Sequence, residues 1–169
     1  MRDFAWLPAQ LAPNKGIAIT FWIVFSRFEY ALKRENYVTG DQSSVSAHWD
    51  GLAQDLNGVW NADRTPELRT AVDYFINQPP RKQTLQNNTL DWTESVLPNH
   101  EPELKRLLTY VRRVRNNLFH GGKFNTGLVP APERDTQLVT NSLIILDECL
   151  TLCELHFNHV YVRFMENSP

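Results

Sequence analysis

The sequence predicts an all-α fold in one soluble domain. Apolar residues recur at helical spacing along most of the chain, and no segment alternates apolar and polar residues as a half-buried strand does. The chain has 169 residues, of which 42% are hydrophobic and 21% are charged. Such a composition supports one domain with a substantial core. We therefore expect residues 1–169 to form a single helical domain of about five helices.

The first three helices are predicted from apolar spacing and from residues that begin or end helices. The first covers residues 13–36, where the apolar positions include Phe21, Phe25, Phe28 and Leu32. The second covers residues 46–56, with Gly58 just beyond its end. The third begins at Thr65, carries Pro66 in its first helical position, and ends at the following proline pair, Pro79-Pro80.

The second half of the chain predicts a long loop and two longer helices. Residues 77–99 are polar and rich in turn formers, so we expect a loop there, with a short helix near residues 91–96. The fourth helix begins near Asn99 or Glu101 and ends at Gly121-Gly122. The fifth covers residues 135–165 and is apolar almost all round. Such a helix lies either at the centre of the core or in an interface with a partner chain.

Several classes of protein are disfavoured by the sequence. The longest apolar run, near residues 17–25, is too short to span a bilayer, and no signal peptide precedes it, so we expect a cytoplasmic protein without membrane contact. Cys149, Cys153, His156 and His159 have a spacing that could hold a metal, but cysteines within an apolar helix favour a core position. No phosphate-binding loop or dinucleotide motif is present. We expect neither a metal nor a cofactor.

One stretch of the chain is strongly basic although the whole protein has a net charge of −2. No acidic residue occurs between Glu103 and Glu133. We call the lysines and arginines of this stretch the basic island: Lys105, Arg106, Arg112, Arg113, Arg115 and Lys123. A local excess of positive charge indicates an anionic ligand, although a solvated helix face is the simpler interpretation of many such runs.

Arg115 occupies an unusual position on the fourth helix. At about 100° per residue, the apolar side chains share one stripe, and Arg115 falls in its middle. The stripe contains Leu104, Leu107, Leu108, Val111, Val114 and Leu118. A charge on a core-facing stripe is costly unless it meets an anion, an acid or a wet cleft. Arg115 is therefore expected to face a groove or interface, or else to pair with a buried acid such as Glu29.

The residues near Arg115 suit cleavage of RNA by its own 2′-hydroxyl. Histidine titrates near neutral pH, so His120 can serve as base or acid. Arginine binds phosphate through two hydrogen bonds and remains charged, and the Asn116 amide can orient a phosphate or the imidazole. On one continuous helix Arg115 and His120 diverge by about 140°. Either the helix unwinds at Gly121-Gly122, or a symmetric dimer places two copies of the motif in one groove.

The segment Arg115-Asn116-Asn117-Leu118-Phe119-His120, followed by two glycines and Lys123, resembles the R-x4-H signature of the HEPN superfamily. Residues 25–32 also resemble the first helix of such domains. The resemblance implies an up-and-down helical bundle and a homodimer with both motifs in one cleft. It also implies metal-independent endoribonuclease activity. Many relatives are toxins or antiphage effectors, and some act beside a cognate antitoxin.

These observations lead to one functional hypothesis and one alternative. The hypothesis is a homodimeric HEPN-type ribonuclease whose catalytic residues are Arg115, His120 and Asn116. Arg112, Asn117 and Lys123 are then expected to bind RNA. The alternative is a non-catalytic HEPN module that dimerises and binds RNA, a nucleotide or a partner protein. The sequence does not identify the RNA target, the pathway or an antitoxin.

Overall fold

The computed structural model describes residues 15–119 and 132–166 of the chain. These residues form six helices and two antiparallel hairpins. The helices are α1 (Lys15–Arg34), α2 (Trp49–Leu56), α3 (Pro66–Asn77), α4 (Glu103–Phe119), α5 (Pro132–His156) and α6 (Asn158–Met165). The strands are β1 (Val38–Gly40), β2 (Val45–Ala47), β3 (Lys82–Gln86) and β4 (Thr89–Thr93). The prediction of a mostly helical protein is confirmed, whereas the expectation that strands would be absent is wrong.

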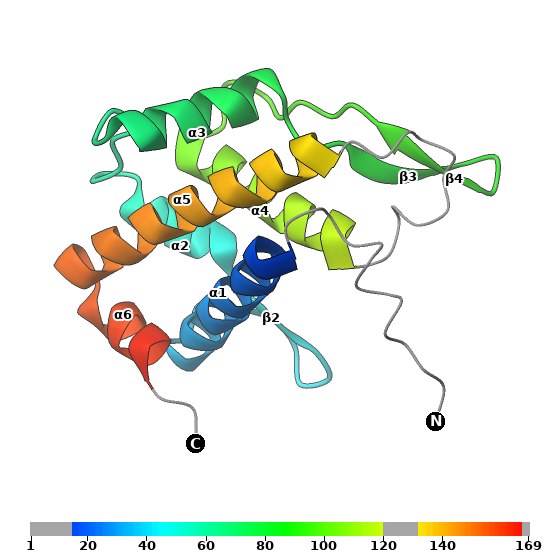
Figure 1. Ribbon diagram of the computed structural model, residues 1–169. Coiled ribbons are helices and arrows are strands. Elements are labelled where there is room, and N and C mark those ends of the chain that lie inside the picture. The colour runs from blue at the N-terminus through cyan, green and yellow to red at the C-terminus, as the bar shows by residue number, and fades with distance from the viewer. Residues whose placement is uncertain (1–14, 120–131, 167–169) are drawn as a thin grey trace.

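Helix α5 is the central element of the fold. It contacts α1, α3, α4, α6 and α2, so neighbours surround it on most sides. Figure 1 shows α5 crossing the molecule, with α3 on one side of it and α1 on the other. Most of its apolar side chains are thus packed within one chain, whereas Leu143, Ile144 and Leu150 are only partly buried and Leu155 is 61% exposed.

The predicted fifth helix is divided in two. Helix α5 ends at His156, and Phe157 leaves helical geometry at φ −137° and ψ 51° before α6 begins. The break allows α6 to pack beside α1. Arg27 of α1 then donates through Nε to the carbonyl of Phe164, at 2.7 Å, and also bonds the carbonyl of Glu166. A cation placed on the last carbonyls of a helix stabilises its C-terminus.

Aromatic rings of α1 form the part of the core that joins α2 and α6. Phe25 stacks on Trp49 with centroids 5.0 Å apart, and Phe28 contacts both Trp49 (5.8 Å) and Phe164 (4.9 Å). All four side chains are buried, with Phe28 fully inaccessible to solvent. The helical spacing of these phenylalanines therefore places one face of α1 against two elements that are distant in sequence.

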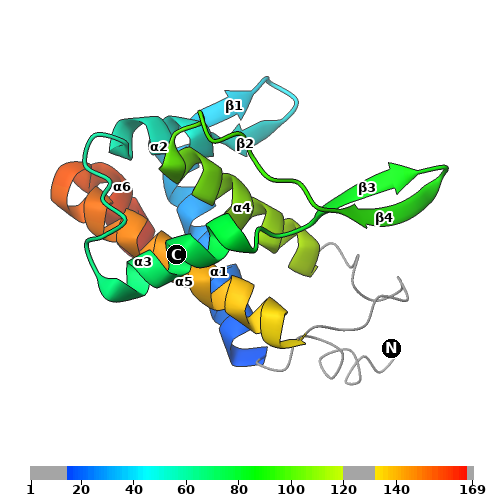
Figure 2. The same ribbon diagram turned by 90° about the horizontal axis from the view of Figure 1, so that it is seen from above.

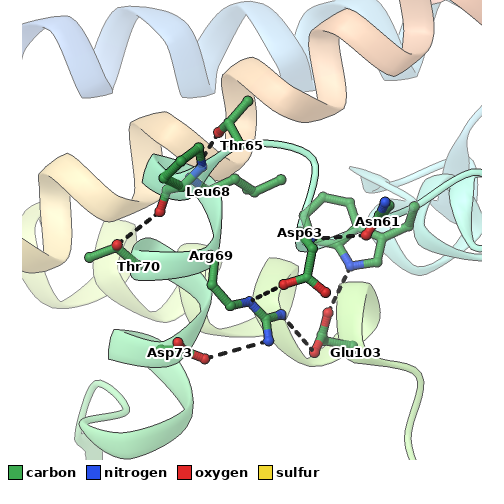
Figure 3. A network of polar contacts seen from close by, with 10 residues as sticks. Asn61, Asp63, Thr65, Leu68, Arg69, Thr70, Asp73 and Glu103 are labelled. Atoms are coloured by element: carbon green, nitrogen blue, oxygen red, sulfur yellow. Dashed lines mark hydrogen bonds and ion pairs between the residues drawn. The ribbon is translucent and has the colours of Figure 1, made fainter.

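A polar network fixes the beginning of α3 against the beginning of α4 (Figure 3). The guanidinium of Arg69 lies 3.2 Å from Asp63, 3.7 Å from Asp73 and 4.0 Å from Glu103. Glu103 also accepts a hydrogen bond from the indole nitrogen of Trp60, at 2.9 Å. Thr65 caps α3, as predicted, because its hydroxyl accepts from the backbone N–H of Leu68.

The segment predicted as a long loop with a short helix at residues 91–96 contains a β-hairpin instead. Strands β3 and β4 pair in antiparallel register from Lys82↔Thr93 to Gln86↔Thr89. Asn87 and Asn88 form the two-residue turn, with φ values of 48° and 60°. Asparagine tolerates this left-handed region, and a turn with two positive φ values matches strand twist. Figure 2 shows the hairpin projecting away from the helices.

The second missed hairpin precedes α2. Strands β1 and β2 have three residues each, too few to show alternation in the sequence. Gly40 has φ 120°, and a Cβ atom there would lie 2.1 Å from the carbonyl oxygen of Ser44. The Asp41 carboxylate accepts from the backbone N–H groups of Ser43 and Ser44 and closes the turn. The helix predicted from residue 46 therefore begins at Trp49.

Phe28→Ala tests the aromatic core. The substitution leaves a cavity between Trp49 and Phe164, so the free energy of unfolding should fall by about 3–5 kcal/mol in urea denaturation. Tyr30→Ala is the matched control, because Tyr30 lies on the same helix and is 42% exposed. It should change the unfolding free energy by less than about 0.5 kcal/mol. Equal effects of the two substitutions would contradict the assigned core face of α1.

Candidate functional site

The apolar stripe predicted for α4 is buried as expected. Leu104, Leu107, Leu108, Val111, Val114 and Leu118 all lie in the core. Tyr110 is also buried, although the sequence analysis did not single it out. Its hydroxyl accepts a hydrogen bond from the backbone N–H of Leu97, at 2.9 Å. The stripe thus fixes α4 against the rest of the protein and sets the direction of Arg115.

Arg115 is half-buried beside α1. Its guanidinium carbon lies 5.6 Å from the centroid of the Phe25 ring, within the range of a cation–π contact. Its Nη1 also donates to Oδ1 of the neighbouring Asn116, at 3.2 Å. Asn116 is exposed. The α1 ring and the adjacent amide therefore hold the arginine at the last turns of α4, where the sequence analysis placed the centre of the site.

His120, Lys123 and the glycines at positions 121 and 122 lie outside the described residues. Of the six residues predicted to act in catalysis or RNA binding, the structure places Arg112, Arg115, Asn116 and Asn117. All four are on the C-terminal half of α4. The predicted convergence of Arg115 and His120 stays a prediction.

The β3–β4 hairpin is attached to α4 at the same end as Arg115. Nη1 of Arg113 donates to the carbonyls of Pro80 (2.9 Å) and Ser95 (2.7 Å), which flank the hairpin on its two sides. Nδ2 of Asn117 donates to the carbonyl of Arg81, at 2.8 Å. From α5, Arg134 donates to the carbonyl of Pro79, at 3.0 Å. Four backbone carbonyls at the hairpin base are thus held by side chains of two helices.

These contacts change the interpretation of the basic island. Arg113 is partly buried with its guanidinium near the ring of Tyr110, and burial lowers its pKa. Lys105 pairs with Glu101 at 2.5 Å, and Arg112 pairs with Asp50 at 3.2 Å. Several charges that the sequence presents as one anion-binding set are therefore engaged within the protein. Sequence reasoning missed this because Asp50 and the hairpin carbonyls are distant in the chain.

Arg112 and Asn117 nevertheless differ in what they can offer a ligand. Arg112 and Asp50 are 35% and 44% exposed, and such an exposed ion pair contributes little and can exchange its carboxylate for a phosphate. The Asn117 amide instead supports the hairpin through its Nδ2 atom. We assign Asn117 a positioning role in the fold, beyond the RNA contact that the sequence predicted.

The cysteines of α5 are core residues. Cys149 and Cys153 are both buried, and burial raises the pKa of the Cys149 thiol well above its usual range and that of Cys153 to about 12. His156 and His159, by contrast, are exposed. Within residues 15–119 and 132–166, no cluster of histidine, cysteine or acidic residues has the arrangement of a metal site.

Comparison of the chain with protein-family models, with curated proteins and with solved structures found no significant match. Among the helices that the structure describes, none is long and apolar enough to cross a membrane.

Arg113→Ala should release the hairpin from α4. The substitution removes the donor to Pro80 and Ser95, so amide hydrogen exchange across residues 82–93 should accelerate by about tenfold or more. Arg112→Ala is the matched control, since this neighbouring arginine pairs with Asp50 and does not contact the hairpin carbonyls in the described contacts. Circular dichroism should show that both variants remain helical. Unchanged exchange in Arg113→Ala would mean that the hairpin is held by other contacts.

Proposed function

We propose that this protein is a metal-independent RNA endonuclease of the HEPN type that acts as a homodimer. The observation that supports this most is the position of Arg115 in the Arg115-to-His120 motif. It is a half-buried cation on an otherwise apolar stripe, beside Phe25, at the end of a helix. A guanidinium held in this way is oriented before a phosphate arrives, so less conformational entropy is lost on binding.

The proposed reaction is transfer of the phosphoryl group to the neighbouring 2′-hydroxyl. One imidazole of His120 takes the proton of the 2′-hydroxyl while its oxygen attacks phosphorus. The bond from phosphorus to the 5′-oxygen breaks, and a protonated imidazole gives a proton to that oxygen. The products are a 2′,3′-cyclic phosphate and a free 5′-hydroxyl. Arg115 stabilises the charge on the phosphoryl oxygens, and Asn116 orients either the phosphate or the imidazole.

A homodimer is proposed because it supplies two copies of the motif to one groove. The apolar character of α5 does not by itself locate the dimer interface, since that helix contacts five other helices of its own chain. The mechanism requires a dimer interface at the C-terminal end of α4, where the motif lies. A role as a toxin or antiphage effector, with a cognate antitoxin, follows from the resemblance to HEPN proteins and belongs to the same proposal.

The internal contacts of the basic island favour a second candidate. Arg113 and Asn117 hold the hairpin, so fewer phosphate contacts are available than the sequence indicates. A non-catalytic HEPN module that dimerises and binds RNA, a nucleotide or a partner protein would need fewer of them. The two candidates differ in whether RNA is cleaved.

The catalytic proposal predicts RNA cleavage that persists in excess EDTA and leaves 2′,3′-cyclic phosphate ends. His120→Ala should reduce the rate by about 10²- to 10⁴-fold, because proton transfer is lost. Arg115→Ala should reduce it by about 10²- to 10³-fold, because charge stabilisation is lost. Mixed-sequence RNA is incubated with each protein, and product ends are identified by mass spectrometry. His156→Ala, an exposed histidine at the end of α5, is the control and should cleave like the wild type.

Three outcomes would count against the mechanism. Intact RNA with a wild-type dimer verified by sedimentation would favour the non-catalytic module. Equal cleavage by wild type and His120→Ala would point to a contaminating nuclease. Unfolding of Arg115→Ala, seen by circular dichroism, would assign the arginine to the core, whereas a folded and inactive variant supports a role with the phosphate.

RNA binding should depend on salt through the remaining basic residues. Arg112→Ala and Lys123→Ala should each lower the log–log salt slope of RNA affinity by about one unit per lost phosphate contact. Lys33→Ala should leave the slope unchanged, because Lys33 lies in the last turn of α1, about two turns beyond the Phe25 that contacts Arg115. Fluorescence anisotropy with a labelled single-stranded RNA measures the affinity. An RNA affinity that does not change with salt concentration would contradict phosphate binding by these basic residues.

A further inference from the structure

A groove of about 580 Å³ lies apart from the described residues of the proposed nuclease site. Its lining comes from α1, α3, α5 and α6 and includes none of the motif residues described on α4. Leu143, Ile144 and Leu150 of α5 provide apolar surface between Val24 of α1 and Leu68 of α3. The α5 lining from Leu143 to Leu150 spans about two helical turns, or roughly 10 Å.

The groove carries negative charge on its rim. Glu67 of α3 and Asp147 of α5 are exposed, and both line it. Glu148 also lines it but is 8% exposed and pairs with Arg64 at 3.1 Å. Neither lysine nor arginine contributes to the described lining. Because Arg64 is occupied by Glu148, Glu67 and Asp147 give the rim a net negative charge.

The apolar surface continues from the groove onto the outer side of α1. Ile23 follows the lining residue Thr20 by one turn and is 47% exposed, and Ile19 is 56% exposed. Trp22, although 52% exposed, lies about 160° round the helix from Thr20 and therefore faces away from the groove. An open apolar groove flanked by an exposed isoleucine is typical of a protein-binding surface.

The charges distinguish between possible partners. A second copy of this chain docking symmetrically over the groove would bring Glu67 and Asp147 against the same acidic surface of the other copy. Like charges placed opposite each other in an interface oppose association. A partner with an apolar stripe flanked by lysine or arginine would match the groove in both respects. Its apolar stripe would pack on the apolar lining, and its basic residues would face the acidic rim.

We propose that this groove binds a basic amphipathic helix of a partner protein. The apolar stripe of that helix packs on Leu143, Ile144 and Leu150, and its basic residues face Glu67 and Asp147. This is the helix-in-groove mode of recognition, in which anchors at successive turns enter one apolar groove. The proposal does not rest on the ribonuclease activity, because none of the described motif residues lines the groove.

The test uses the full-length protein and two fluorescein-labelled helical peptides of about 14 residues, roughly 21 Å long. Both carry leucines along one face, and the flanking positions are lysine in one peptide and glutamate in the other. Anisotropy should show saturable one-to-one binding of the lysine peptide, at least about tenfold tighter than that of the glutamate peptide. Raising the salt from about 0.05 to 0.5 M should weaken it, since the charges are exposed.

Two variants and a control locate the binding site. Asp147→Lys should lower the affinity for the lysine peptide by about threefold to tenfold. Ile144→Ser should lower this affinity more than Asp147→Lys does, because it removes an apolar anchor. Glu133→Lys makes the same charge change on α5 outside the groove and should leave binding unchanged. Circular dichroism verifies that each variant is folded.

Equal binding of the two peptides, no saturable binding, or equal weakening by Asp147→Lys and Glu133→Lys would overturn the proposal. A dimer that forms in sedimentation only when Asp147 is changed to lysine, and that excludes the peptide, would identify a second copy as the better occupant. None of these outcomes alters the RNA-cleavage assay, so failure of the groove and failure of the nuclease are distinguishable.

Discussion

The ring of Phe25 connects the core of this protein to its candidate functional site. It stacks on Trp49 with centroids 5.0 Å apart, and the guanidinium of Arg115 lies 5.6 Å from its centroid. The first contact joins α1 to α2, and the second positions the arginine of the motif. Because Phe25 is buried, the surface on which Arg115 rests is as rigid as the core itself. A change in aromatic packing would therefore move the arginine as well as lower stability.

The hairpin adds a second constraint at the same end of α4. Arg113 and Asn117 differ from Arg115 by two positions along the chain, yet they bind hairpin carbonyls while Arg115 lies over a ring of α1. A helix distributes neighbouring residues around its circumference, so one short segment contacts α1 on one side and the hairpin on another. The final turns of α4 are thereby held on both sides.

Sequence reasoning succeeded where the determining contacts repeat with the helical period. The stripe on α4 and the burial of Phe21, Phe25 and Phe28 follow from spacing alone. The β1–β2 hairpin was missed because its strands have three residues each, and the β3–β4 hairpin was missed because its turn is Asn87-Asn88. The charge count of the basic island also overstated the positive charge available to a ligand. A count along the chain does not show that Asp50 lies beside Arg112 or that the carbonyl of Pro80 lies beside Arg113. These partners are brought together by tertiary packing and leave no local pattern.

The net charge of −2 conceals an uneven distribution of charged residues along the chain. The motif region of α4 lies in a stretch without acids, whereas the groove beside α5 is lined by Glu67, Asp147 and Glu148 and by no described lysine or arginine. The proposed RNA substrate would be repelled by the acidic rim of the groove, and the proposed basic helix would be repelled by the arginines near the motif. The two proposed ligands therefore have opposite charge and favour different parts of the protein. Helix α1 links the two places, since Phe25 contacts Arg115 while Thr20 and Val24 line the groove. Helix α1 is thus the element whose displacement by a bound partner would reach the arginine, and a rigid aromatic contact transmits such a displacement better than a flexible loop would.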